Sequence, residues 1–219
     1  DLELCDLLPY NTEKAKTFHG AYGLKSVTVT VQNADGTAIN LGTDDITVKY
    51  AGTDSVAYTN KGVLDRVATM QKAGSKGTPL TTTTKNTKDN SVTFTPDTMP
   101  IHRATGKSEL GSLYLQLQNL PNAIVKVHVE LAVTQTKDGV NALLTDNDNT
   151  VQQSNDTYNN IYFARAGGEN NALLTSPTAS IKVRSRSISG LVWMDQNYDG
   201  IYTTKLDDTG KKNVGSDKT

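Results

Sequence analysis

Short stretches in which apolar and polar residues alternate recur along this chain of 219 residues. The longest is Val125–Val133, where an apolar residue occupies every second position. A period of two is the repeat of a β-strand, because successive side chains point to opposite faces of a sheet. Such a strand buries one face and exposes the other, so the pattern predicts antiparallel sheets that share a core.

Other stretches follow the same pattern and are separated by turn residues. The strands predicted in this way are Leu2–Leu8, Leu24–Gln32, Ile46–Tyr50, Ser91–Thr95, Leu113–Leu117, Asn160–Ala164 and Ser180–Ser187. After the second of them, Asp35 and Gly36 form the kind of pair that closes a tight turn. Frequent short strands between turns predict an all-β fold, namely an antiparallel β-sandwich.

Two segments depart from the alternation. Lys61–Lys72 spaces Val63, Leu64, Val67 and Met70 near one face of a helix, which predicts a short surface helix packed on a sheet edge, or a helical turn in a loop. Thr78–Asn90 is a polar run without alternation and predicts a long exposed loop or the tip of a hairpin.

Composition excludes some classes of partner. The formal net charge is −1, which does not favour nucleic acid or an anionic membrane surface. No apolar run approaches the length of a membrane span, so no insertion in a membrane is expected for this segment. Cys5 is the single cysteine and cannot form an internal disulfide. We expect it to be a small buried residue of the first strand, with a reactive or intermolecular thiol as the alternative.

A candidate cation loop follows the apolar residues Leu191–Met194. Asp195, Asn197 and Asp199 alternate, so their side-chain oxygens can converge on one point, and the following Gly permits a sharp turn. The backbone carbonyl of Ile201 falls at the next ligand position. Ligands that are all oxygen favour calcium over zinc, so the loop predicts a calcium site.

The far end of this loop differs from a helix-loop-helix calcium site. Position twelve is Leu206 rather than a bidentate Glu, so Asp207 or Asp208 would have to close a longer loop. The alternative is an Asx-rich turn without metal. A second acidic run, 146–149, is a poorer candidate because no Gly follows it.

Residues 188–201, with the sequence ISGLVWMDQNYDGI, resemble the opening of the B-type repeat domains of Gram-positive surface proteins, the Sdr and Cna B families. Asp6–Asn11, followed by Phe18–Tyr22, resembles a segment that often stands before such repeats in large Gram-positive surface proteins. The resemblance implies an immunoglobulin-like antiparallel β-sandwich, of the kind found in adhesins and pilin-like proteins, over residues 1–186. Residues 187–219 would then be the start of a B-type repeat domain that is truncated here.

Some sandwich modules of this kind carry a spontaneous amide bond between Lys and Asn or Asp, formed beside a buried acid. Lys25, Lys126 and Lys182 lie in predicted strands, and Glu130 lies in the longest one. The usual placement of the reacting residues is missing, because the last predicted strand of the first domain has no Asn or Asp and Leu191–Met194 has no Lys. Ordinary surface lysines are therefore the expectation.

Signals for catalysis are weak. His19, His102 and His128 are scattered, and none has metal-ligand spacing with another His or Cys. We therefore expect a non-enzymatic structural or adhesive segment of an extracellular, cell-wall-anchored surface protein. It would be a stalk or a ligand-binding module whose partners are its neighbouring domains and a host matrix protein or glycan. The alternatives are a carbohydrate-binding or accessory module of a secreted enzyme and, with less support, a hydrolase with clustered acids.

Overall fold

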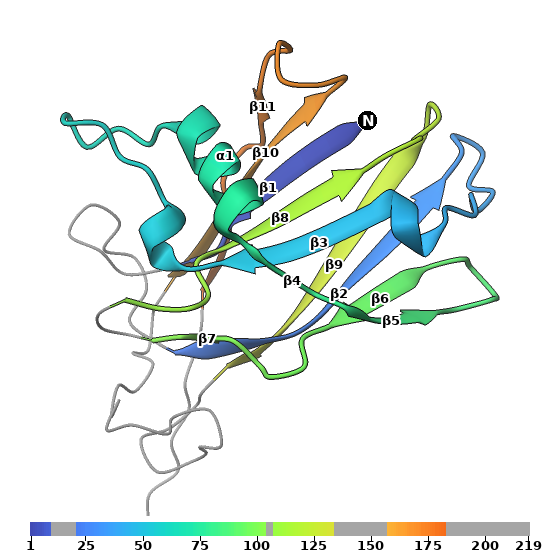
Figure 1. Cartoon of the computed structure of the whole chain (residues 1–219), viewed down its shortest axis with the longest axis horizontal. Coiled ribbons are helices and arrows are strands. Elements are labelled where there is room, and N and C mark those ends of the chain that lie inside the picture. Colours follow the sequence, from blue (N-terminus) through green and yellow to red (C-terminus); the bar gives the residue numbers. More distant parts are fainter. Residues whose placement is uncertain (10–20, 104–106, 134–156, 183–219) are drawn as a thin grey trace, which may run out of the picture. The chain divides into compact units, whose positions relative to one another are not determined.

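A computed structural model describes residues 1–9, 21–103, 107–133 and 157–182 of the chain (Figure 1). The chain divides into two units, Asp1–Ser185 and Arg186–Thr219, and the whole second unit lies outside the described residues. The domain boundary expected near residue 186 stays a prediction. Within the described ranges, no helix is long and apolar enough to cross a membrane.

The strands form two antiparallel sheets. Sheet A has the order β11-β10-β1-β8-β3-β4, with β12 also paired to β10. Sheet B has the order β5-β6-β2-β7, with β9 also paired to β2. The strands of sheet A are β1 (Leu2–Leu7), β3 (Ile46–Ala51), β4 (Thr78–Pro79), β8 (Ser112–Leu117), β10 (Thr157–Ala166), β11 (Leu174–Thr175) and β12 (Ala179–Lys182). Those of sheet B are β2 (Tyr22–Gln32), β5 (Thr82–Lys85), β6 (Val92–Thr95), β7 (Ile101–His102) and β9 (Ile124–Val133).

The main core lies between the two sheets and confirms the predicted antiparallel β-sandwich. Sheet B contributes Val27 and Val29 from β2, and sheet A contributes Leu113 and Leu115 from β8, all of them at most 1 % exposed. These are alternate residues of their strands, as the period of two requires. The predicted turn after β2 is also present, with Gly36 at φ +90° donating its N–H to the carbonyl of Asn33 over 3.0 Å.

A second apolar cluster covers the outer face of sheet A, where helix α1 (Arg66–Lys76) packs on β1, β3 and β8 (Figure 1). Met70 and Ala73 of the helix meet Cys5, Tyr114 and Phe163 of the sheet. Cys5 is fully buried there, as expected from the sequence, and burial raises the pKa of its thiol. The helix therefore closes a face that a two-layer sandwich would leave in contact with water.

The predicted bounds of this helix were wrong by one turn. Gly62 has φ +76° and its N–H bonds to the carbonyl of Thr59 in a turn, so the chain is not helical there. Asp65 caps the helix instead, because its carboxylate accepts the N–H of Ala68 at 3.0 Å. Val63 and Val67 consequently stay largely exposed rather than packing on the sheet.

The polar run Thr78–Asn90 is not one long loop, but residues 86–90 form the tip of a hairpin, which confirms the second predicted alternative for that part. It contains β4 and β5, and β5 pairs with β6 from Thr82 opposite Thr95 to Lys85 opposite Val92. All four residues of β5 are exposed. A strand at the edge of a sheet with both faces in water has no apolar side, so its sequence carries no alternation to reveal it.

Replacing Phe163 by Ala tests the packing of the helix on sheet A. The side chain is fully buried, so the cavity left behind should lower the free energy of unfolding by about 3–5 kcal/mol. Urea unfolding monitored by circular dichroism measures this loss. Val63→Ala is the matched control, since Val63 is 61 % exposed and its truncation should change stability by less than about 0.5 kcal/mol. Equal effects of the two changes would contradict the assignment of this second core.

Candidate functional site

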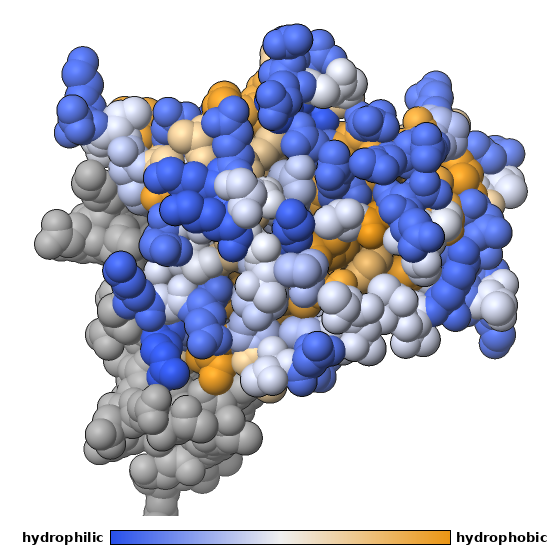
Figure 2. Space-filling model, in the orientation of Figure 1, coloured by the Kyte–Doolittle hydropathy of each residue, from blue (hydrophilic) through white to orange (hydrophobic). Residues whose placement is uncertain are grey.

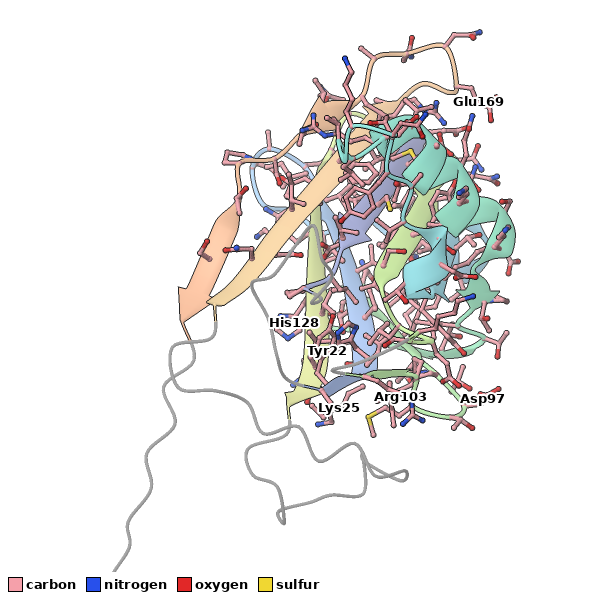
Figure 3. The ribbon with its side chains drawn as sticks, turned by 90° about the vertical axis from the view of Figure 1, so that its left-hand side faces the viewer. Tyr22, Lys25, Asp97, Arg103, His128 and Glu169 are labelled. Atoms are coloured by element: carbon pink, nitrogen blue, oxygen red, sulfur yellow. The ribbon has the colours of Figure 1, made fainter. Side chains whose placement is uncertain are left out.

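The two sheets end unevenly on one side of the sandwich. Among the described residues, β9 pairs with β2 alone, so it forms an edge of sheet B. In sheet A, β10 pairs with β1 on one edge and with β11 and β12 on the other. Figure 3 shows β9 and β12 on the side of the sandwich away from α1, and β10 running from that side toward the helix. Sheet A thus continues past the point at which the described part of sheet B ends.

A groove of about 820 Å³ lies at this uneven margin. One wall consists of Val125, Val127 and Val129 of β9, which are only partly buried. The floor and the other wall come from alternate inward residues of β1, β8 and β10, and the turn Leu120–Ala123 closes one end. The groove is therefore an extension of the main core that no strand within the described ranges covers.

The groove has small and aliphatic walls. Ala164 and Ala166 of β10 line it opposite the three valines, and Leu2 and Leu4 line it from β1. Tyr162 is the aromatic residue of this lining and is 46 % exposed. On the face drawn in Figure 2, where α1 and β3 lie in front, apolar side chains show among hydrophilic ones. Walls of this kind favour aliphatic groups of a ligand.

One end of the groove is polar. Asp6 of β1 lies in the inward register of Leu2 and Leu4 and is buried, and Asn160 of β10 lies beside it. The side-chain amide of Asn160 donates a hydrogen bond to the Asp6 carboxylate. The Oδ1 atoms of both residues are buried and have no hydrogen-bond partner among the described groups. Burial raises the pKa of Asp6 to about 6, and the hydrogen bond from Asn160 opposes part of that rise.

The outer face of the same strands gives a contrast. Arg165 is buried, and its Nη2 lies 2.6 Å and its Nε 2.9 Å from Oε2 of Glu3. The Tyr114 hydroxyl donates to the other oxygen of Glu3 at 2.6 Å. Both carboxylate oxygens are thus satisfied, and the trio ties β1, β8 and β10 together. On the inward face, by contrast, the Oδ1 atoms of Asp6 and Asn160 remain as hydrogen-bond acceptors without a partner among the described groups.

The histidines lie in different surroundings. His102 is buried and stacks on Tyr22 with ring centroids 4.6 Å apart, while its Nδ1 lies 3.0 Å from the carbonyl oxygen of Leu110. The Tyr22 hydroxyl donates to the carbonyl of Pro9. These contacts fix β7 against β2, as a structural histidine would. His128 is exposed on β9, and His19 lies outside the described residues.

Lys25 and Glu130 form an ion pair between β2 and β9, with about half of each side chain exposed. The hydrogen bond from Lys25 lowers the pKa of Glu130. An amide crosslink needs a buried, uncharged lysine, so this solvated pair is unsuited to it. Lys126 is exposed as well, and the side chain of Lys182 is not described.

The predicted calcium ligands lie in the part of the chain that is not described. They are Asp195, Asn197, Asp199, Ile201, Asp207 and Asp208. The acidic run 146–149 also lies outside the described residues. Within the described ranges, no three His, Cys, Asp or Glu side chains are grouped so that they could hold a metal ion. The calcium site stays a prediction from sequence.

No family model, no curated protein and no solved structure matches this chain. Similarity therefore assigns neither a family nor an activity, and the functional proposals depend on the fold, the groove and the sequence motifs.

Sequence reasoning missed Asp6 and Asn160 as site residues. The available signal was a break in alternation, since Asp6 occupies an inward position after Leu2 and Leu4. A single acid at the end of a short strand is also what a solvated strand end would show. Only the pairing of β1 with β10 brings Asn160 next to it.

The raised pKa of Asp6 predicts a pH-dependent stability. Because the folded chain binds this proton more tightly than the unfolded chain, ionisation between about pH 4 and 6 should cost on the order of 3 kcal/mol of unfolding free energy. Stability of the wild type relative to Asp6→Asn should therefore fall as pH rises from 4 to 7. Urea titrations at each pH measure this difference, with exposed Asp44→Asn as the control that should follow the wild type. A difference that does not vary with pH would contradict the burial of this carboxyl.

Proposed function

We propose that this chain is a non-enzymatic structural and adhesive segment of a Gram-positive, cell-wall-anchored surface protein. The observation that carries the proposal is the apolar groove beside β9, which offers a ligand-binding face on a rigid sandwich. The resemblance of residues 188–201 and 6–11 to surface-protein segments supports the location outside the cell. The segment would then act as a stalk, a ligand-binding module or both.

The lining of the groove favours a polypeptide ligand over a sugar. Sugars are commonly held by aromatic rings that stack on them, whereas this groove presents Val, Leu and Ala with the single ring of Tyr162. A host matrix protein therefore fits the walls better than a glycan. A carbohydrate-binding module of a secreted enzyme is the weaker candidate for the same reason.

The second unit would contribute a calcium site to this role. Asp195, Asn197 and Asp199, with the carbonyl of Ile201 and with Asp207 or Asp208, supply the oxygen ligands. Carboxylates in one loop repel each other, and a divalent ion removes this repulsion and orders the loop. Calcium bound directly after the sandwich would stiffen the junction of a stalk.

Chelation tests the calcium proposal. Calcium that binds the folded loop should raise the melting temperature of the whole chain, and excess EGTA should reverse this rise. Differential scanning calorimetry with calcium and with EGTA measures the effect, and isothermal titration with calcium gives the stoichiometry. The double change Asp195→Asn and Asp199→Asn should abolish both signals, whereas exposed Asp44→Asn should leave them unchanged. A wild-type melting curve that is the same with and without EGTA would count against the site.

Adhesion tests the broader proposal. Beads coated with the chain should adhere to at least one immobilised extracellular-matrix protein and should not bind a glycan array. Bead retention under flow measures adhesion, and beads coated with the heat-denatured chain are the control. Binding to glycans alone would favour the carbohydrate-binding alternative, and retention equal to that of the control would contradict an adhesive role.

A further inference from the structure

We propose that the groove is a strand-addition site, in which an extended polypeptide pairs with the outer edge of β9. Its alternate apolar side chains would fill the groove, and a Lys or Arg would reach Asp6 and Asn160. This inference rests on the proposed adhesive function and deepens it, because it names the chemical class of the ligand and the way in which it is held.

The edge of β9 supplies the backbone part of such a site. In an antiparallel pair, alternate N–H and C=O groups of each strand point away from its partner. Because β9 pairs with β2 alone among the described strands, one such row along Ile124–Val133 faces outward. Protected edges are usually short, bulged or interrupted by proline. This edge has ten residues, and its pairing with β2 has one irregularity, between Leu24 and Ser26 near one end. The register is continuous from Ser26 opposite Glu130 to Gln32 opposite Ile124.

The unequal sheets supply the space. Beyond β1, sheet A continues with β10 and then with β11 and β12, while sheet B ends at β9 within the described ranges. The inner face of β10 therefore has no described strand opposite it. Adjacent strands lie about 4.8 Å apart and packed sheets about 10 Å apart, so one added strand beside β9 would lie under β10. Ala164 and Ala166 line β10 there, and their small side chains leave room for those of the incoming strand.

The polar end supplies the preference for a basic side chain. Leu2 pairs with Ala166 and Leu117 near the turn after β8, whereas Asp6 pairs with Tyr162 and Leu113 four residues further on. Four residues of strand span about 13 Å. At the Leu2 end the acid of the lining is the exposed Asp1, whereas at the other end it is the buried Asp6. An ammonium or guanidinium group donates several hydrogen bonds and would satisfy both unpartnered Oδ1 atoms. The matching ligand has two alternate apolar residues and a Lys or Arg at the next inward position.

A second copy of the chain fits this margin less well than a single strand. Pairing β9 with β9 of another copy would bring the overhanging β10 and β12 of both copies to the same side of the joined sheet. The two overhangs would then compete for one space. An extended segment brings no overhang, so we infer a single strand as the occupant.

Synthetic peptides test the proposal on the full chain. The probe is a fluorescent, amidated peptide of sequence Thr-Val-Thr-Val-Thr-Lys-Thr-Val-Thr, which should bind in fluorescence anisotropy. Replacing its Lys by norleucine should weaken binding about tenfold or more, because a charge-assisted hydrogen bond is lost. N-methylation of the Thr amides blocks one edge of the peptide, and N-methylation of the other amides blocks the opposite edge. One of these two peptides should bind like the parent and the other should not, since a single edge pairs with β9.

Three protein variants locate the binding. Ala164→Trp fills the groove and should abolish binding, and Asp6→Asn should make the Lys and norleucine peptides bind alike. Thr83→Trp on exposed β5 is the matched control and should bind like the wild type. Circular dichroism and thermal melts establish that each variant folds. Hydrogen exchange on the wild type needs no variant, and addition of the peptide should protect amides of β9.

Several outcomes would overturn the inference: no binding, equal binding of both N-methylated peptides, or unchanged exchange in β9. The inference would also be overturned if the outward amides of β9 were already protected from hydrogen exchange in the free chain. Protection that rises with concentration would assign the edge to a second copy, and protection independent of concentration would assign it to the chain itself. Adhesion to matrix proteins without peptide binding would remove this inference and leave the proposed function. Peptide binding without adhesion would leave the strand-addition site and remove the proposed adhesive function.

Discussion

The burial of one apolar face from each sheet is the interaction on which the rest of the structure depends. Val27 and Val29 from sheet B and Leu113 and Leu115 from sheet A are almost completely removed from water. Because side chains alternate along a strand, this burial fixes the register of every central strand, and a slip by one residue would expose the whole face. The outer face of sheet A is then free to receive α1, and the overhang of sheet A leaves the groove.

The central strands could be predicted from sequence because their environment is one-sided. A strand with one face in the core and one in water must alternate, and β2 and β9 do so. β8 could be predicted because Leu113, Leu115 and Leu117 alternate on its inner face, although α1 covers part of its outer face. The edge elements could not be predicted in this way. β5 is exposed on both faces, while β4 and β11 have two residues each, so neither burial nor length leaves a pattern. The start of α1 depended on Gly62 and the Asp65 cap, which local apolar spacing does not report.

The candidate site was hidden from sequence for a related reason. Asp6 and Asn160 lie far apart along the chain, and each taken alone is an ordinary polar residue beside apolar ones. Pairing of the first strand with one near the end of the sandwich creates the site, and such long-range pairing has no local signature. The calcium loop is the opposite case, since its ligands are contiguous and can be read directly from the sequence.

The two faces of β1 differ in how completely their acidic side chains are paired. Outward Glu3 is saturated by Arg165 and Tyr114, and this network holds three strands of sheet A together. Inward Asp6 has one partner in Asn160 and keeps an acceptor unused, although burying such a group costs free energy. A leucine at that position would continue the aliphatic lining without this cost. The acid therefore fits a groove that has to recognise a donor better than it fits a core that only has to pack.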